Sequence, residues 1–323
     1  MVNNEFADAI VEGLSKRSGY EYRWENVKKN NNVVLTGIFE SCPESNLSAC
    51  IYADYYEEYY QQGQDLESII NKISKVFNER RLVGERTPIT QENFSLAKVK
   101  DRLRAKLVNL KRNEGIPIIP CGDELALSFY VDVTGLFGSQ VSDLAASVRV
   151  NEGLLNFWGV SLDTIAQFAL QNEDEMDYQI TPISDIMKEH IRTQIPFCMM
   201  SDEEFEQFCE DNLPPDNFMN VLTNQDKSKI PVAILAKDML KEFCCSHGIS
   251  ELFVIPSSIN EVILLDKDQT DGDPEAVHTI IEQVNGEVVD PTEVLSDIPF
   301  IYDLKSNTLK NAKTGVNVLP MLS

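Results

Sequence analysis

The sequence predicts an α+β protein in two units, with mixed α/β character in the C-terminal half. The chain has 323 residues, whereas a single hydrophobic core seldom grows past roughly 250–300 residues. Hydrophobic residues make up 43% of the chain and charged residues 25%, which is typical of a globular protein. Segments with strand periodicity and segments with helical periodicity both occur, and we find no internal repeat.

Charge divides the chain near residue 112. Residues 1–112 hold 17 Lys+Arg and 16 Asp+Glu, a net charge of +1, whereas residues 113–323 hold 11 and 36, a net charge of −25. The change falls just before Gly115 and Pro117, which break helices. We therefore predict an N-terminal α+β unit over residues 1–112 and an acidic α/β unit over residues 113–323.

The N-terminal unit begins with a helix and three strands. Phe6, Ile10 and Leu14 form the apolar stripe of the helix, which ends at Gly19. The hydrophobic pattern then predicts three strands, at residues 20–27, 33–39 and 49–53. Three consecutive asparagines form the turn between the first two strands.

Three helices complete the N-terminal unit. A Tyr-rich helix ends at Gly63, and an amphipathic helix runs from Leu66 to Phe77. After a loop over residues 79–92, a basic helix is expected over residues 93–111, and this helix closes the unit. Its apolar stripe consists of Leu96, Val99, Leu103, Leu107 and Leu110. Its candidate basic face consists of Lys98, Arg102, Arg104 and Lys106.

The acidic unit begins with strands at residues 116–119 and 125–133. Ser161 and Ser201 are suited to cap two helices, the second of which is the acidic helix Asp202 to Asp211. The pattern then predicts a strand, a helix and two strands that form a hairpin, at residues 232–235, 238–245, 252–255 and 262–265. Asp273-Pro274-Glu275 marks the start of the last helix, because it combines an N-cap, a proline at the first helical position and an acid near the positive end.

Several classes of function have little support in the sequence. A net charge of −24 repels phosphate backbones and anionic lipid, and no stretch approaches the ~20 apolar residues of a membrane span. The glycine-rich motifs that bind nucleotides are missing, and His190, His247 and His278 are isolated along the chain. We therefore assign no catalytic residue, no metal ligand and no cofactor.

The expected location is the cytoplasm. The first residues carry acids where a secretory signal needs bases followed by an apolar core. Seven cysteines without regular spacing suit free thiols in a reducing compartment better than a disulfide framework.

The one candidate binding loop consists of Ser257, Ser258, Asn260 and Glu261. It follows a predicted buried strand, a position at which ligand sites of parallel α/β sheets tend to lie. The alternative is a tight hairpin in which the hydroxyl groups bond to their own backbone. No histidine lies nearby along the chain to activate a serine, so we expect the loop to bind or to build structure rather than to catalyse.

Seven segments of the chain carry a resemblance to a known family. They are residues 34–38, 55–59, 107–109, 119–120, 221–224, 255–259 with 261–262, and 295–297. On these segments the chain resembles an uncharacterised bacterial family, domain of unknown function 5688. The resemblance implies no known activity. The family tends to carry a histidine where this chain has Cys121 and another where it has Asn260, so any proton transfer by those imidazoles would be lost here.

The leading functional hypothesis is a soluble cytoplasmic binding or regulatory protein without catalytic chemistry. One alternative is a hydrolase that uses the loop from Ser257 to Glu261. A second is single-stranded nucleic-acid binding by the N-terminal unit, whose basic helix and tyrosines suit phosphate pairing and stacking. Because Asp54, Glu57 and Glu58 interleave with those tyrosines, a protein or small-molecule partner is favoured, or self-association of the basic helix with the acidic half.

Overall fold

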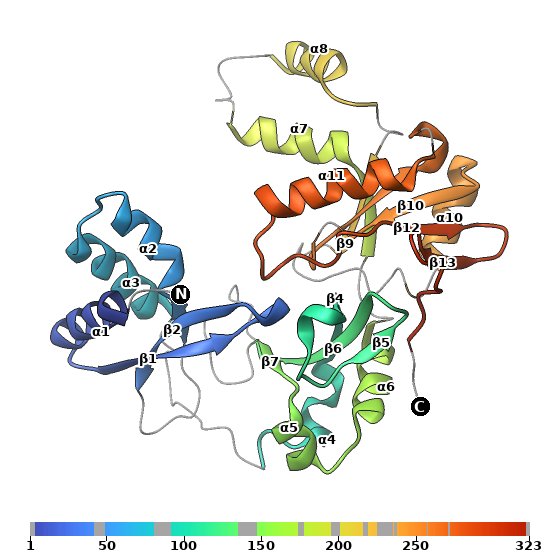
Figure 1. Cartoon of the computed structure of the whole chain (residues 1–323). Helices are drawn as coiled ribbons and strands as arrows, with labels where there is room; N and C mark the ends of the chain where they lie inside the picture. Colours follow the sequence, from blue (N-terminus) through green and yellow to red (C-terminus); the bar gives the residue numbers. More distant parts are fainter. Residues whose placement is uncertain are drawn as a thin grey trace. The chain divides into compact units, whose positions relative to one another are not determined.

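The computed structural model describes residues 4–41, 49–80, 92–134, 147–173, 178–194, 201–215, 219–224, 235, 238–256, 258–270 and 272–320 (Figure 1). It confirms the α+β class, with helices and three antiparallel sheets. The chain forms two compact units, which comprise residues 1–104 with 130–161 and residues 105–129 with 162–323. A boundary between separately folding domains at residue 112 stays a prediction.

The first sheet of unit 1 has the order β1-β2-β3. Its strands are β1 (Glu21–Lys28), β2 (Val34–Ser41) and β3 (Cys50–Tyr52), and all of them pair antiparallel. The asparagine turn lies between β1 and β2 as predicted. Asn31 and Asn32 take positive φ values of 59° and 58°, which asparagine tolerates better than most residues.

Three helices accompany this sheet: α1 (Asn4–Ser18), α2 (Asp54–Gln61) and α3 (Leu66–Arg80). The inward faces of α1 and α3 carry Ile10, Leu14, Ile69 and Ile73, which are fully buried. They pack in one cluster with Ile38 of β2 and Ile51 of β3. One face of the small sheet is therefore covered by helices, as the predicted apolar stripes require.

The basic helix predicted over residues 93–111 is wrong. This segment forms the short helix α4 (Leu96–Val99), the 3-10 turn η2 (Lys100–Arg102), strand β4 (Leu103–Asn109) and a second 3-10 turn, η3 (Lys111–Asn113). Leu103, Ala105 and Leu107 are buried while the intervening Arg104 and Lys106 are partly exposed. Burial therefore alternates with a period of two residues, as in a strand. The spacing of the leucines alone fits a helix, and the alternation becomes apparent only when the buried Ala105 is included.

A second sheet contains β4, β5 (Ile119–Cys121), β6 (Leu125–Asp132) and β7 (Ser147–Arg149). Unit 2 holds β5 and the start of β6, whereas unit 1 holds the end of β6, strand β7 and helix α5 (Glu152–Trp158). Within unit 1, the indole Nε1 of Trp158 donates a hydrogen bond to the backbone O of Phe94 at 2.8 Å.

Unit 2 is built on a third sheet with the order β13-β12-β10-β11-β9-β8. The strands are β8 (Tyr178–Pro182), β9 (Met219–Asn224), β10 (Glu251–Ile255), β11 (Val262–Asp266), β12 (Phe300–Asp303) and β13 (Thr308–Asn311). The predicted hairpin of β10 and β11 is confirmed. Both neighbours of β10 are antiparallel, and the strand predicted before it lies, apart from Leu235, outside the described residues.

The helices of unit 2 whose bounds lie within the described residues are α6 (Leu162–Glu173), α7 (Ile183–Gln194), α8 (Asp202–Asn212), α10 (Asp238–His247) and α11 (Pro274–Glu287). Val277 and Ile281 of α11 pack against Phe253 and Ile255 of β10, and Figure 1 shows α11 lying across the sheet. The start of α11 is confirmed, since Asp273 accepts from the backbone N of Glu275 at 3.0 Å. None of the helices that the structure describes is long and apolar enough to cross a membrane.

Candidate functional site

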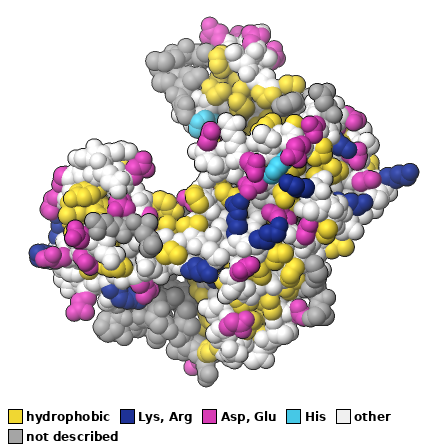
Figure 2. Space-filling view, in the orientation of Figure 1, with side chains coloured by type: hydrophobic (Ala, Val, Ile, Leu, Met, Phe, Trp, Pro, Cys, Tyr) yellow, Lys and Arg dark blue, Asp and Glu magenta, His cyan; other side chains and the backbone are white. Residues whose placement is uncertain are grey.

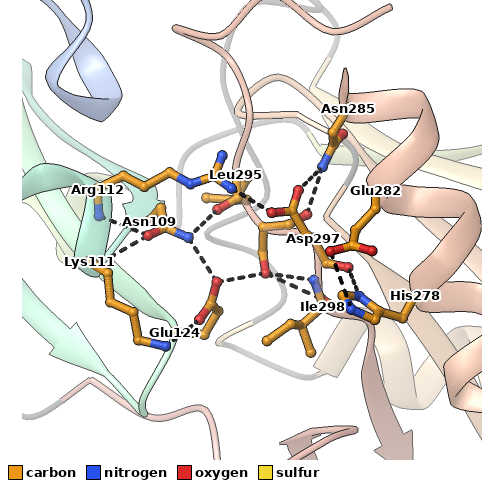
Figure 3. A network of polar contacts seen from close by, with 11 residues as sticks. Asn109, Lys111, Arg112, Glu124, His278, Glu282, Asn285, Leu295, Asp297 and Ile298 are labelled. Carbon is orange, nitrogen blue, oxygen red and sulfur yellow. Dashed lines mark hydrogen bonds and ion pairs between the residues drawn. The ribbon is translucent and has the colours of Figure 1, made fainter. Parts of the chain in front are cut away.

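The largest polar cluster that we find in unit 2 centres on the carboxylate of Glu124, in the turn between β5 and β6 (Figure 3). Glu124 is only 7% exposed. Its Oε1 accepts hydrogen bonds from Asn109 Nδ2 at 2.9 Å and from Ser296 Oγ at 3.1 Å, and its Oε2 accepts from Lys111 Nζ at 3.2 Å. Two separate segments of the chain, residues 109–111 and the segment of Ser296, therefore satisfy one buried carboxylate.

The network continues through Asp297, which follows Ser296. Asp297 forms an ion pair with Arg112, and its Oδ1 accepts from Asn285 Nδ2 at 2.8 Å. His278 Nδ1 lies 2.7 Å from the backbone O of Asp297. Because a carbonyl only accepts, the proton of this bond must sit on Nδ1. The other ring nitrogen, Nε2, lies 3.7 Å from Glu282 Oε1.

These contacts favour a structural role for the network. Ser296 is fully buried, and its hydroxyl is bonded to Glu124 and to the backbone N of Ile298. The acids and bases pair with one another and connect β4 and the β5–β6 turn to the segment after α11 (Figure 3). Within the described part of the chain, no group of three or more His, Cys, Asp or Glu side chains is placed to hold a metal ion.

The predicted binding loop lies between β10 and β11. Ser257 falls outside the described residues. Ser258 is 8% exposed, and its Oγ accepts from the backbone N of Asn260 at 3.0 Å. Glu261 is exposed at the start of β11, and its backbone O accepts from Ser258 N at 3.4 Å. The described hydroxyl is therefore engaged within its own turn.

Two further contacts anchor this loop to its surroundings. Thr223 Oγ1 of β9 donates to the backbone O of Asn260 at 3.1 Å, and Ile259 N donates to the backbone O of Glu293 at 2.8 Å. Glu293 lies a few residues before Ser296 of the polar network. A binding role for Ser257, Ser258, Asn260 and Glu261 stays a prediction.

A family model described as a family of unknown function, DUF5688, matches residues 3–304. The chain belongs to this family. The match covers most of the chain and confirms the resemblance drawn from the sequence. No curated protein and no solved structure matches the chain.

Several of the segments that carry the resemblance to DUF5688 contact one another in unit 2. Asn109 donates to the backbone O of Leu295 at 3.1 Å, and Thr223 bonds to the loop that follows β10. Cys121, which directly follows the matching segment 119–120, is buried in β5. Burial raises the pKa of its thiol to about 12, so Cys121 stays protonated at neutral pH.

The predicted basic face of this DUF5688 protein is not one face of a helix. Lys98 lies in α4, Arg102 in η2, and Arg104 and Lys106 in β4. Arg102 Nη1 donates to the backbone O of Thr134 at 2.8 Å, and Arg104 Nη1 donates to the backbone O of Asp101 at 2.9 Å. Self-association through a basic helix therefore has no helix to support it.

Helices α7 and α8 form a surface that was not among the sites predicted from the sequence. Ser201 and Glu204 form a capping box at the start of α8, which confirms that predicted cap. Phe205 and Cys209 of α8 are buried, whereas Phe208 is 38% exposed. The acids of α8 are Asp202, Glu203, Glu204, Glu206, Glu210 and Asp211, and the helix contains no Lys or Arg.

Arg192 joins α7 to α8. Its Nη2 lies 3.8 Å from Asp202 Oδ1 and 3.4 Å from Glu206 Oε1, and its guanidinium carbon lies 4.8 Å from the centre of the Phe205 ring. The apolar residues of α7 are Ile183, Ile186, Met187 and Ile191, of which none is buried, and Met187 is 38% exposed. Their helical spacing was the signal in the sequence that could have indicated this surface.

Proposed function

We propose that this DUF5688 protein is a cytoplasmic, non-catalytic binding protein whose helices α7 and α8 bind a basic amphipathic segment of another protein. The observation that carries the proposal is the exposure of Met187 and Phe208, each 38% exposed, on two helices joined by Arg192. In Figure 2, acidic side chains gather over α8 and hydrophobic side chains lie beneath them.

This chemistry selects a partner with apolar and basic side chains. Exposed Met and Phe offer apolar contact area, and methionine adapts its shape to different partners. Six carboxylates in the eleven residues of α8 attract Lys and Arg. A helix with one apolar face and one basic face meets both requirements.

The charge of unit 2 supports the same partner. Unit 2 holds 13 Lys+Arg and 33 Asp+Glu, a net charge of −20, whereas unit 1 holds 15 and 19, a net charge of −4. A strongly acidic surface accelerates encounter with basic ligands and opposes phosphate backbones. The acidity also makes binding sensitive to salt, because exposed charges are screened beyond a Debye length of ~10 Å at 0.1 M salt.

The proposal is tested with a fluorescent peptide of about 20 residues in which leucines recur at helical spacing on one face and lysines occupy the opposite face. We expect saturable binding, read as fluorescence anisotropy, that weakens as salt rises. Phe208→Ser and Met187→Ser should each weaken binding by roughly 5–30-fold, since truncating a contact residue at an interface costs about 1–2 kcal/mol.

The matched control is Ile280→Ser, which changes an apolar residue on α11 that is 62% exposed. This variant should bind the peptide like the unmodified protein. Equal losses in all three variants would mean that the peptide responds to general hydrophobicity, and the assignment to α7 and α8 would then be wrong. A peptide with the same composition and no amphipathic order should bind more weakly.

The hydrolase alternative is separated by an activity screen with ester, phosphate and peptide substrates. Turnover that disappears in Ser257→Ala or Ser258→Ala would contradict a non-catalytic role and favour a hydrolase built on that loop. We expect no such turnover, because no histidine lies near this loop along the chain and a serine needs an adjacent base to become a strong nucleophile.

A further inference from the structure

Strand β1 lies at the edge of the first sheet of unit 1. In the part of the chain that the structure describes, it pairs with β2 on one side only. The strand is eight residues long and contains no proline, which is one of the residues that block strand edges. An edge of this length presents a row of backbone groups that can pair with another chain.

The hydrogen bonds of β2 show which backbone groups of β1 face this edge. The backbone N of Thr36 donates to Asp54 Oδ2 at 2.6 Å, and its backbone O accepts from Ala53 N at 2.9 Å. Both groups of Thr36 therefore point toward β3 and away from β1. Asn26 lies opposite Thr36, so its own N–H and C=O point away from β2. Because the pattern alternates, the N–H and C=O of Trp24 also point to the edge.

The side chains of β1 alternate between the two faces of the sheet. Tyr22 is buried among the core residues that the helices contribute, and Trp24 packs against the same core. The Trp24 indole donates to Asp8 Oδ1 of α1 at 2.8 Å. Arg23 and Glu25 therefore lie on the opposite face, and both are exposed. A cation and an anion thus stand two residues apart on one exposed strand face.

We propose that β1 pairs antiparallel with β1 of a second copy of the chain, so that the sheets of the two copies join into one. The pairing is centred on Trp24, which lies opposite Trp24 of the second copy at a two-fold axis. The outward backbone groups of the two Trp24 residues exchange hydrogen bonds across this axis. The same patch of surface serves both copies, as in most closed dimers.

Charge complementarity selects this register and the second copy as the occupant. With Trp24 at the axis, Arg23 of each copy lies opposite Glu25 of the other, at the closely spaced positions that carry no backbone hydrogen bonds. A shift by two residues in one direction places Glu25 opposite Glu25, and the reverse shift places Arg23 opposite Arg23. Both of these registers oppose like charges, and larger shifts shorten the paired stretch. The strand is therefore complementary to itself.

Sedimentation equilibrium of the full chain from low to high micromolar concentration tests the proposal. We expect the mass to rise from that of one chain to that of two. Arg23→Glu and Glu25→Arg should each weaken the association by roughly tenfold, because both cross-strand pairs of the dimer then join like charges. The matched control is Lys75→Glu, which reverses a cation on α3 whose side chain is 78% exposed. This variant should associate like the unmodified protein.

Mixing the two charge-reversal variants separates pairing from a folding defect. In a mixed dimer of Arg23→Glu with Glu25→Arg, both cross-strand pairs again join opposite charges. The mixture should therefore associate more tightly than either variant alone, and the double variant should associate like the unmodified protein. A defect in the fold of either variant would not be repaired by mixing. A mixture that associates no better than its components overturns the proposal.

Asn26→Pro tests the backbone pairing itself. Because the N–H of Asn26 faces the edge, proline leaves the bonds between β1 and β2 intact but removes a donor that the dimer uses. The variant should stay monomeric. In the unmodified protein, hydrogen exchange at the amides of Trp24 and Asn26 should slow as concentration rises.

Two further outcomes would contradict the proposal. One is an unmodified chain that stays monomeric at every concentration. The other is a dimer that Arg23→Glu and Asn26→Pro leave unchanged, since it would have to form through another surface. The experiment does not depend on α7 and α8, so its failure would leave the peptide-binding proposal unchanged.

Discussion

The buried carboxylate of Glu124 is paired with the exposed ammonium of Lys111, 3.2 Å away, and their side chains are 9% and 70% exposed. Removing one member of such a pair does not have the same consequence as removing the other. Glu124 also accepts from Asn109 and Ser296, so its loss leaves buried donors without an acceptor. Removal of the Lys111 side chain, by contrast, abolishes only one contact that is screened by solvent.

We therefore predict that Glu124→Leu lowers the free energy of unfolding by roughly 2–5 kcal/mol, because unsatisfied buried polar groups cost about 1–3 kcal/mol each. Lys111→Met should lower it by less than about 1 kcal/mol. Urea denaturation followed by circular dichroism measures both values. Similar losses in the two variants would contradict the central position of Glu124 in the network.

A second prediction compares two glycines with positive φ in unit 2. Gly122 has φ +86°, and an added Cβ would lie 2.9 Å from the backbone O of Asn317, whereas Gly315 has φ +73° with nothing within 4 Å. Gly315→Ala should cost roughly 1–2 kcal/mol for the left-handed backbone. Gly122→Ala should cost roughly 1–3 kcal/mol more for the overpacking. Urea denaturation of both variants tests the difference, and equal costs would argue against the close approach of Asn317.

A third prediction concerns the pH dependence of the α8 cap. The backbone N of Ser201 donates to Glu204 at 2.9 Å, and this bond together with the Ser201 hydroxyl holds the pKa of Glu204 below its ordinary value of 4.5. Because the pKa of Glu204 is lower in the folded protein than in the unfolded chain, its ionised carboxylate stabilises the cap fully at pH values above the unfolded-chain pKa. This stabilisation is lost as pH falls through the pKa of the folded protein. The affected window therefore lies below about pH 4.5.

The cap is tested by hydrogen exchange of α8, corrected for intrinsic rates, in the unmodified protein and in Glu204→Gln. At about pH 6 the variant should exchange faster, and below the window the two proteins should converge. Glu203→Gln, which changes a neighbouring exposed acid, should match the unmodified protein throughout. A difference that persists unchanged at low pH would rule out the ionised carboxylate as its cause.

A fourth prediction concerns two adjacent thiols at the end of α10. Cys245 is exposed, whereas Cys244 is buried, and burial raises the pKa of Cys244 to about 11. Because the thiolate is the reactive form, a thiol reagent at about pH 8 should modify Cys245 within minutes and Cys244 only after denaturation. Mass spectrometry of the labelled peptides reads out both sites, and Cys245→Ser should abolish the fast label on this helix.

The sequence predicts the elements whose signals are local. The start of α11 at Asp273-Pro274 and the capping box of α8 at Ser201 are encoded within four residues, and both are confirmed. The helix predicted for the segment from Leu96 to Leu107 was wrong, because its leucines fit a helical period whereas Leu103, Ala105 and Leu107 fit the period of a strand. The buried environment of β4 decided between the two.

The polar network could not be predicted in the same way. Ser296 lies 172 residues from Glu124 along the chain, and no local pattern indicates that two such residues meet. Part of the α7–α8 surface could be predicted, since the sequence indicates the acidic helix α8. The proposal that it binds a partner rests on the exposure of Met187 and Phe208, which only the fold reveals.

The most direct test of the central proposal is hydrogen exchange of the full chain with and without the basic amphipathic peptide. We expect the peptide to slow hydrogen exchange in α7 and α8, while exchange in α11 and in the helices of unit 1 stays unchanged. Phe208→Ser should reduce this protection at equal peptide concentration. Protection confined to other helices, or no protection at saturating peptide, would contradict binding at α7 and α8.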